Sequence, residues 1–141
     1  MKHEHALQLT AKLAAGTSKA KRSALAAASP SPFAGHWKNQ MGSTMDLTVQ
    51  GSIVSGQYSS ADSSTGKTTT GALSGVINDH VIAFSVNWPS PSITSWTGHL
   101  VTENGSAIIE TLWFLAMEME DPNDQSKLWS SVFSGADRFV R

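Results

Sequence analysis

The chain has 141 residues, which is enough for one domain of ordinary size. Charged residues make up 15% of it and the formal net charge is −1, so we expect neither nucleic acid nor a membrane as a partner. The absence of cysteine excludes disulfide bonds and cysteine-ligated metal sites. The 21 serines and 12 threonines disfavour a helical bundle.

Residues 1–32 differ from the rest of the chain in charge and composition. They contain five basic residues and one acidic residue, whereas residues 33–141 contain five basic and ten acidic residues. The segment is rich in alanine and ends in Ser29-Pro30-Ser31-Pro32, which predicts a stiff linker. We therefore expect an N-terminal extension over 1–32, either flexible or the remnant of a targeting signal, followed by a β-domain over 33–141. The apolar run is too short for a convincing export signal, so a cytoplasmic location stays open.

From Gly35 onward, short segments of alternating apolar and polar residues are separated by turn residues, which is typical of β-strands. The clearest predicted strands are 44–49, 53–60, 81–88, 95–102, 107–117 and 130–140, the last interrupted near Gly135. Tight turns are predicted at Gly51-Ser52, Asn78-Asp79 and Asn104-Gly105. About eight consecutive strands with short loops predict an all-β fold, an eight-stranded antiparallel up-and-down β-barrel with room for one small ligand. A β-sandwich stays the structural alternative.

No motif in the sequence is typical of an enzyme. The five histidines do not have the spacing of a helical zinc motif, and neither a nucleophile elbow nor a phosphate-binding loop occurs. The acidic segment 118–124 lacks the spaced oxygen ligands of a calcium loop. We therefore expect a binding protein with no catalytic residues, no metal and no cofactor.

Six ordered motifs, which hold all five tryptophans, resemble those of the avidin and streptavidin family. The first reads Gly-His-Trp-Lys-Asn-Gln-Met-Gly-Ser-Thr over residues 35–44. The others are 56–60, 84–88, 94–98, 111–115 and the set Trp129, Gly135, Asp137 and Phe139. The resemblance covers about residues 35–139 and implies high-affinity, non-covalent binding of biotin in the barrel mouth. A lipocalin-like carrier of another small hydrophobic ligand is the alternative, since lipocalins share the opening Gly-x-Trp.

The resemblance implies a role for each polar residue of the site. Asn39, Ser43 and Tyr58 would donate hydrogen bonds to the ureido oxygen of biotin. Asp137 and Ser60 would accept hydrogen bonds from its two ureido N–H groups. The donors and the acceptors would then strengthen one another across the urea.

The resemblance also implies contacts to the rest of the ligand. The remaining implied contacts are aromatic and apolar walls from Trp88, Trp96, Trp113 and Leu115, with Phe84 adding to them, a hydroxyl of Thr94 on the thioether and a hydroxyl of Ser92 on the tail carboxylate. The loop 61–67 is shorter than in streptavidin and would close over the tail as a lid, with a backbone N–H near Ser63 or Ser64 on the carboxylate.

Trp129 has a different implied role. In the family, the equivalent tryptophan closes the pocket of a neighbouring subunit. The resemblance therefore implies a homo-oligomer, namely a homotetramer that shares Trp129 between subunits. It also implies a secreted or periplasmic location.

Overall fold

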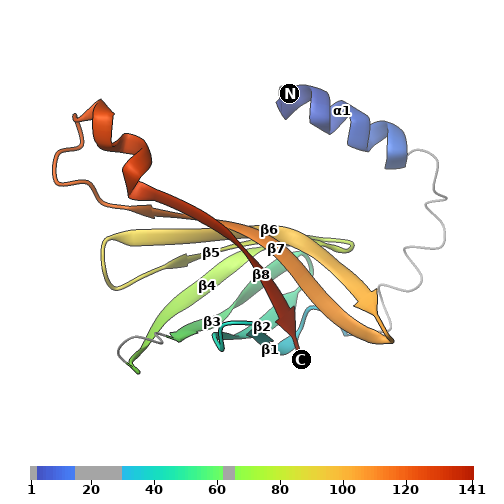
Figure 1. Cartoon of the computed structure of the whole chain (residues 1–141). Coiled ribbons are helices and arrows are strands. Elements are labelled where there is room, and N and C mark those ends of the chain that lie inside the picture. The colour runs from blue at the N-terminus through green and yellow to red at the C-terminus, as the bar shows by residue number, and fades with distance from the viewer. Residues whose placement is uncertain (1–2, 15–29, 62–65) are drawn as a thin grey trace. The chain divides into compact units, whose positions relative to one another are not determined.

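The chain divides into two compact units, Met1–Ser31 and Pro32–Arg141. The computed structural model describes residues 3–14, 30–61 and 66–141. The described part of the first unit includes the helix α1 (His3–Ala14), drawn blue in Figure 1. Residues 1–2 and 15–29 of the predicted extension, including any targeting signal there, lie outside the described residues. No helix in the described part of the chain is both long and apolar enough to cross a membrane.

The second unit is a closed barrel of eight antiparallel strands in which each strand pairs with its neighbours in sequence and β8 returns to β1 (Figure 1). The strands are β1 (Gly35–Asn39), β2 (Thr44–Gln50), β3 (Ile53–Ala61), β4 (Thr68–Asn78), β5 (Val81–Asn87), β6 (Ser92–Glu103), β7 (Ser106–Met117) and β8 (Val132–Val140). A 3-10 helix, η1 (Gln125–Ser131), precedes β8. The eight-stranded up-and-down barrel predicted from the sequence is confirmed, and closure of the sheet excludes the β-sandwich.

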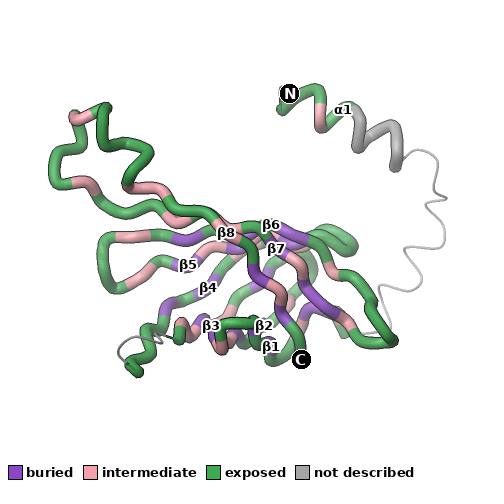
Figure 2. The backbone as a smooth tube through the Cα atoms, viewed as in Figure 1, coloured by how far each residue is buried: buried purple, intermediate pink, exposed green. Residues whose placement is uncertain are grey.

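Alternation of side chains across each strand builds the barrel interior. In β2, Met45 and Leu47 are buried while Asp46 and Thr48, which alternate with them, are exposed, as the sequence pattern predicts. Figure 2 shows this change between buried and exposed positions along the strands, whereas η1 contains no buried residue. The interior face of the strands therefore carries the residues that fill or line the barrel.

Four details of the strand prediction are wrong. The last strand begins at Val132, because the preceding residues form η1, and it runs through Gly135 without interruption. A Cβ at Gly135 would lie 2.5 Å from the Trp113 indole, so this glycine allows a close approach and does not break the strand. The strand predicted over 95–102 is longer and begins at Ser92. The turn before β5 lies at Asp79, which has a positive φ of 56°, and follows the last residue of β4.

A plug of large side chains closes one end of the barrel. Phe33, Trp37 and Phe139 are completely buried, and the Trp37 indole N–H donates to the Phe33 carbonyl oxygen over 2.8 Å. The Arg141 guanidinium lies 4.3 Å from the centre of the Trp37 ring and donates to the carbonyl oxygens of Ala34 and Pro32. The segment before β1 and the last residue of the chain therefore seal this end together.

Candidate functional site

A cavity of about 260 Å³ lies at the opposite end of the barrel from the Trp37 plug. Ten of the twelve site residues predicted from the sequence line it: Asn39, Ser43, Tyr58, Ser60, Trp88, Thr94, Trp96, Trp113, Leu115 and Asp137. Met41 and Ala61 also line it and were not predicted. Residues separated by up to 98 positions in the sequence therefore meet in one concave site.

The turn after β1 orients the Asn39 amide. Its Oδ1 accepts hydrogen bonds from the backbone N–H groups of Met41 (3.0 Å) and Ser43 (2.9 Å). Gly42 has a φ of 89°, a value that glycine adopts without strain, and this allows the tight turn. Because the amide oxygen is held by the turn, the Nδ2 group points inward and donates to the Tyr58 hydroxyl over 3.3 Å. The local turn chemistry and the site geometry thus depend on the same side chain.

The Tyr58 hydroxyl stays protonated in this environment. The residue is only 3% exposed, and its ring stacks on Trp96 at 4.9 Å and meets Trp88 edge to face at 5.8 Å. Burial raises the pKa of Tyr58 well above its ordinary value, the Asp137 charge raises it further, and a hydrogen bond with Ser43 partly offsets both. The neutral hydroxyl accepts from Asn39 and keeps its own proton to donate.

Ser43 is prepared in the same way as Tyr58. It is 5% exposed, and its Oγ accepts a hydrogen bond from the Ala61 backbone N–H over 3.0 Å. Its hydroxyl proton is therefore not used in that bond. Asn39, Ser43 and Tyr58 bring three hydrogen-bond donors to the cavity.

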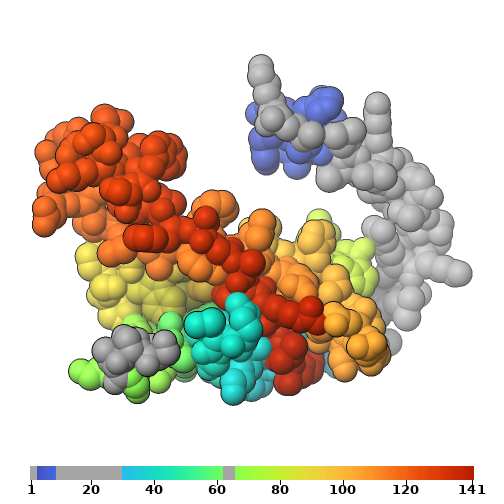
Figure 3. Space-filling model, viewed as in Figure 1, coloured from blue at the N-terminus to red at the C-terminus, as the bar shows by residue number. Residues whose placement is uncertain are grey.

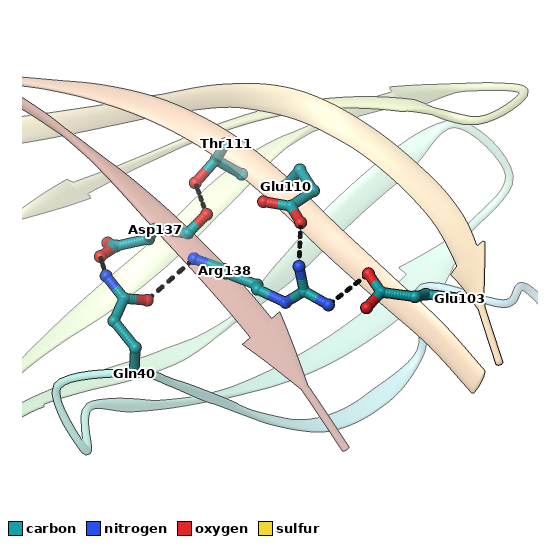
Figure 4. Close-up of polar contacts among 6 residues, drawn as sticks. All are labelled: Gln40, Glu103, Glu110, Thr111, Asp137 and Arg138. Carbon is teal, nitrogen blue, oxygen red and sulfur yellow. Dashed lines mark hydrogen bonds and ion pairs between the residues drawn. The ribbon is translucent and has the colours of Figure 1, made fainter.

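The Asp137 carboxylate also lines the cavity and is held by two neutral donors. The Trp96 indole N–H donates to its Oδ2 over 2.8 Å, and the Gln40 side-chain amide donates to its Oδ1 over 3.1 Å (Figure 4). The Thr111 hydroxyl donates to the Asp137 carbonyl oxygen over 3.0 Å. Gln40 was not predicted from the sequence, although it follows Asn39 directly and its amide can reach across the turn. Asp137 is 8% exposed, so its charge acts in a region of low dielectric.

Aromatic side chains form most of the remaining wall. Trp88, Trp96 and Trp113 all line the cavity, and the Trp88 indole N–H donates to the Thr94 hydroxyl over 2.9 Å. Phe84 lies behind this wall and does not line the cavity, because its ring stacks on Trp96 at 5.0 Å with an angle of 13°. The prediction that Phe84 adds to the wall is therefore wrong, and its ring packs against Trp96 instead.

Two predicted site residues do not line the cavity. Ser92 is half-buried at the start of β6, and its hydroxyl lies 3.1 Å from that of Ser90. Trp129 lies on η1 and is 78% exposed. The segment that carries η1 projects beyond the strands of the barrel (Figures 1 and 3). Most of the predicted lid, residues 62–65 with Ser63 and Ser64, lies outside the described residues.

Comparison with known proteins places this site in context. The model of the avidin family matches residues 27–141. The structure of xenavidin is 28% identical with a TM-score of 0.67, and the match covers 78% of this chain and 96% of that one. The rhizavidin–biotin complex is 34% identical, with a TM-score of 0.62 and coverage of 76% and 89%. For the short afifavidin–biotin complex these values are 31%, 0.62, 75% and 86%. A comparison with curated protein sequences finds no match.

Proposed function

The chain belongs to the avidin family, and on this premise we propose that its barrel binds biotin non-covalently and does not transform it. Two of the similar structures described above are biotin complexes. One observation carries the proposal. Three hydrogen-bond donors and a buried carboxylate line one small cavity with indole walls.

The polar groups match the ureido ring of biotin. Its carbonyl oxygen accepts hydrogen bonds, and we assign it to the donors Asn39, Ser43 and Tyr58. Its two N–H groups donate, and we assign them to the Asp137 carboxylate and the Ser60 hydroxyl. A negative charge at one side of the urea and three donors at the other would polarise the urea. This would strengthen every hydrogen bond of the network around it.

The apolar part of the ligand fits the aromatic wall. We assign the fused rings to Trp88, Trp96 and Trp113, whose flat faces bury apolar area with little loss of side-chain freedom. We assign the ring sulfur to the Thr94 hydroxyl and the start of the tail to Leu115. Because hydrogen bonds already orient Asn39, Thr94 and Asp137, little ordering remains to oppose binding. We assign the tail carboxylate to Ser92 and the loop 61–67.

We propose further that the functional state is a homotetramer in which Trp129 closes the site of a neighbouring subunit. Trp129 is 78% exposed, whereas tryptophan is strongly buried on average. An apolar outer face supports assembly as well. Ile93, Leu112 and Phe114 on β6 and β7 are 50%, 64% and 61% exposed, and they lie on the outside of adjacent strands.

A purely hydrophobic ligand fits the site less well. The lipocalin-like alternative would bury Asp137 and Tyr58 against apolar atoms, which would leave the carboxylate lone pairs and the hydroxyl proton facing the ligand without partners. We therefore keep biotin as the one proposed ligand.

Isothermal titration tests the ligand assignment. We expect one biotin per subunit, a negative heat of binding, and a higher melting temperature in saturating biotin. Lipoate is the matched control ligand, because it has the same valerate tail and a sulfur ring but no urea. It should bind at least a thousandfold more weakly. No heat and no melting shift with biotin, or equal binding of lipoate, would contradict the proposal.

Trp129→Ala tests the shared site. Biotin affinity should fall and the oligomer should dissociate at higher protein concentration, both measured on one sample by titration and by light scattering after size exclusion. Lys127→Ala on the same helix is the matched control, since Lys127 is 66% exposed and makes only a 3.8 Å ion pair with Asp124. A wild-type chain that is monomeric at every concentration would exclude the shared site.

A further inference from the structure

The barrel closes through its shortest strand pairing. Strands β1 and β8 share two register pairs, Lys38↔Val140 and Asn39↔Phe139, whereas every other pair of neighbouring strands shares at least four. We call this pairing the seam. Asn39 lies on one side of the seam and Asp137 on the other, so the two polar ends of the site are joined across it.

The side chain of Gln40 extends the seam where the backbone of β1 turns away. Its Oε1 accepts from the Arg138 backbone N–H over 2.9 Å, and its Nε2 donates to the Ala136 carbonyl oxygen over 3.1 Å. These backbone groups lie on either side of Asp137 in β8. A side-chain amide has one acceptor and two donors, so it can replace a missing backbone partner at this edge. Figure 4 shows this amide between the turn after β1 and the β8 strand.

The second donor contact of the same amide reaches the Asp137 carboxylate. Nε2 donates to Oδ1 over 3.1 Å, while Trp96 holds Oδ2 over 2.8 Å. The adjacent cation, Arg138, makes ion pairs with Glu110 at 2.9 Å and with Glu103 (Figure 4). Its guanidinium is therefore engaged by two other carboxylates. Two neutral donors then fix the Asp137 rotamer without neutralising its charge.

We propose that Gln40 is a positioning residue that closes the seam at the barrel mouth and fixes the Asp137 carboxylate for the ligand's ureido N–H group. This inference rests on the proposed function. It assigns Gln40 no ligand contact, because Gln40 is not among the residues that line the cavity. Gln40 should therefore affect biotin affinity only by positioning Asp137.

A double-mutant cycle with the full chain tests this. Gln40→Met keeps the length of the side chain and removes its hydrogen bonds. It should weaken biotin binding about tenfold to a hundredfold, the usual cost of losing a hydrogen bond to a charged group. In an Asp137→Asn background the same change should weaken binding less than threefold, because the carboxylate it positions is gone. Gln57→Met, on the exposed face of β3, is the matched control and should bind biotin like the wild type.

A second variant and a measurement on the wild type keep the test independent of folding. Gln40→Glu is nearly isosteric and keeps an acceptor for the Arg138 N–H, but it faces Asp137 with an oxygen. It should lose more affinity than Gln40→Met. In the unmodified protein, hydrogen exchange at the Arg138 backbone amide should be slow because Gln40 accepts that hydrogen bond.

The outcomes separate this inference from the function it rests on. Equal losses for Gln40→Met in both backgrounds would show a merely structural role and overturn it. Wild-type affinity in Gln40→Met, or fast exchange at the Arg138 amide, would also overturn it while leaving biotin binding intact. Failure of the unmodified chain to bind biotin would overturn the proposed function and this inference with it.

Discussion

The two ends of the barrel are built from the same strands but use inward-facing side chains in opposite ways. At the closed end, Trp37 and Phe139 are completely buried, and the polar atoms there bond to the protein itself. At the open end, Asn39 and Asp137 are nearly as deeply buried, yet they line a cavity. The comparison separates stability, which the closed end provides, from recognition, which the open end provides.

On β1 and on β8, the inward-facing residues of the closed end and of the open end are only two positions apart. Trp37 and Asn39 face inward on β1, as Phe139 and Asp137 do on β8, because side chains in a strand alternate with a period of two. The rigid plug therefore lies one inward position away from the polar groups of the site. We expect the closed end to limit motion at the mouth without contacting the ligand.

The largest expected effect is on stability, from Trp37→Ala at the closed end. Removing a fully buried indole leaves a cavity and releases the Phe33 carbonyl oxygen, so the free energy of unfolding should fall by about 3–5 kcal/mol. Urea denaturation without ligand, at one protein concentration, measures this. His36→Ala on the outer face of β1 is the control and should cost less than about 1 kcal/mol, since it loses only an exposed contact to Asp46. A loss of similar size in both variants would remove the distinction between the closed end and an ordinary surface.

The next effect is on binding, from Tyr58→Phe at the mouth. Loss of the hydroxyl removes one proposed donor to the ureido oxygen, and biotin affinity should fall by about 1.5–3 kcal/mol, measured by titration. The free energy of unfolding should change by less than about 1.5 kcal/mol, because the ring stacking on Trp96 is kept and the loss is confined to the hydrogen bonds of the Tyr58 hydroxyl with Asn39 and Ser43. A large loss of stability with unchanged affinity would assign Tyr58 to the core.

Patterns with a local cause were predictable from the sequence. Alternation in β2 and the turn at Asn104-Gly105, where both residues have positive φ, depend on neighbours along the chain. The cavity residues followed from motifs that resemble one family, and the strand period then brought most of them to the same interior. The barrel and most of its cavity lining could therefore be predicted before the structure, whereas Met41 and Ala61 could not.

Features that depend on contacts between distant segments were not predictable in this way. Gly135 looked like a strand break, but its role is to admit the Trp113 indole, which lies 22 positions earlier. Gln40 had no predicted role, because its partners Ala136, Asp137 and Arg138 lie almost a hundred positions away. Such roles require knowledge of which strands meet at the seam.

The smallest expected effect concerns the protonation of Tyr58, the only tyrosine in the chain. Absorbance at 295 nm therefore reports its ionisation without interference from another phenol. Burial and the Asp137 charge raise the pKa of Tyr58 in the folded state, whereas an exposed tyrosine in the unfolded chain ionises near pH 10. We expect no tyrosinate signal through pH 10 while circular dichroism stays native.

The sign of the linked stability change follows from the direction of that shift. Below about pH 10 both states are protonated and the full stabilisation is present, while above it the unfolded state alone loses its proton. The free energy of unfolding should therefore fall by about 1.4 kcal/mol per pH unit above pH 10, until the folded state also ionises. Tyr58→Phe should lack this contribution, and Asp137→Asn should lower the pKa of Tyr58 because one of its causes is removed. An ionisation midpoint near pH 10 in the folded protein would show that water reaches the hydroxyl freely, and the mouth would then lack the low-dielectric character that distinguishes it from the barrel surface.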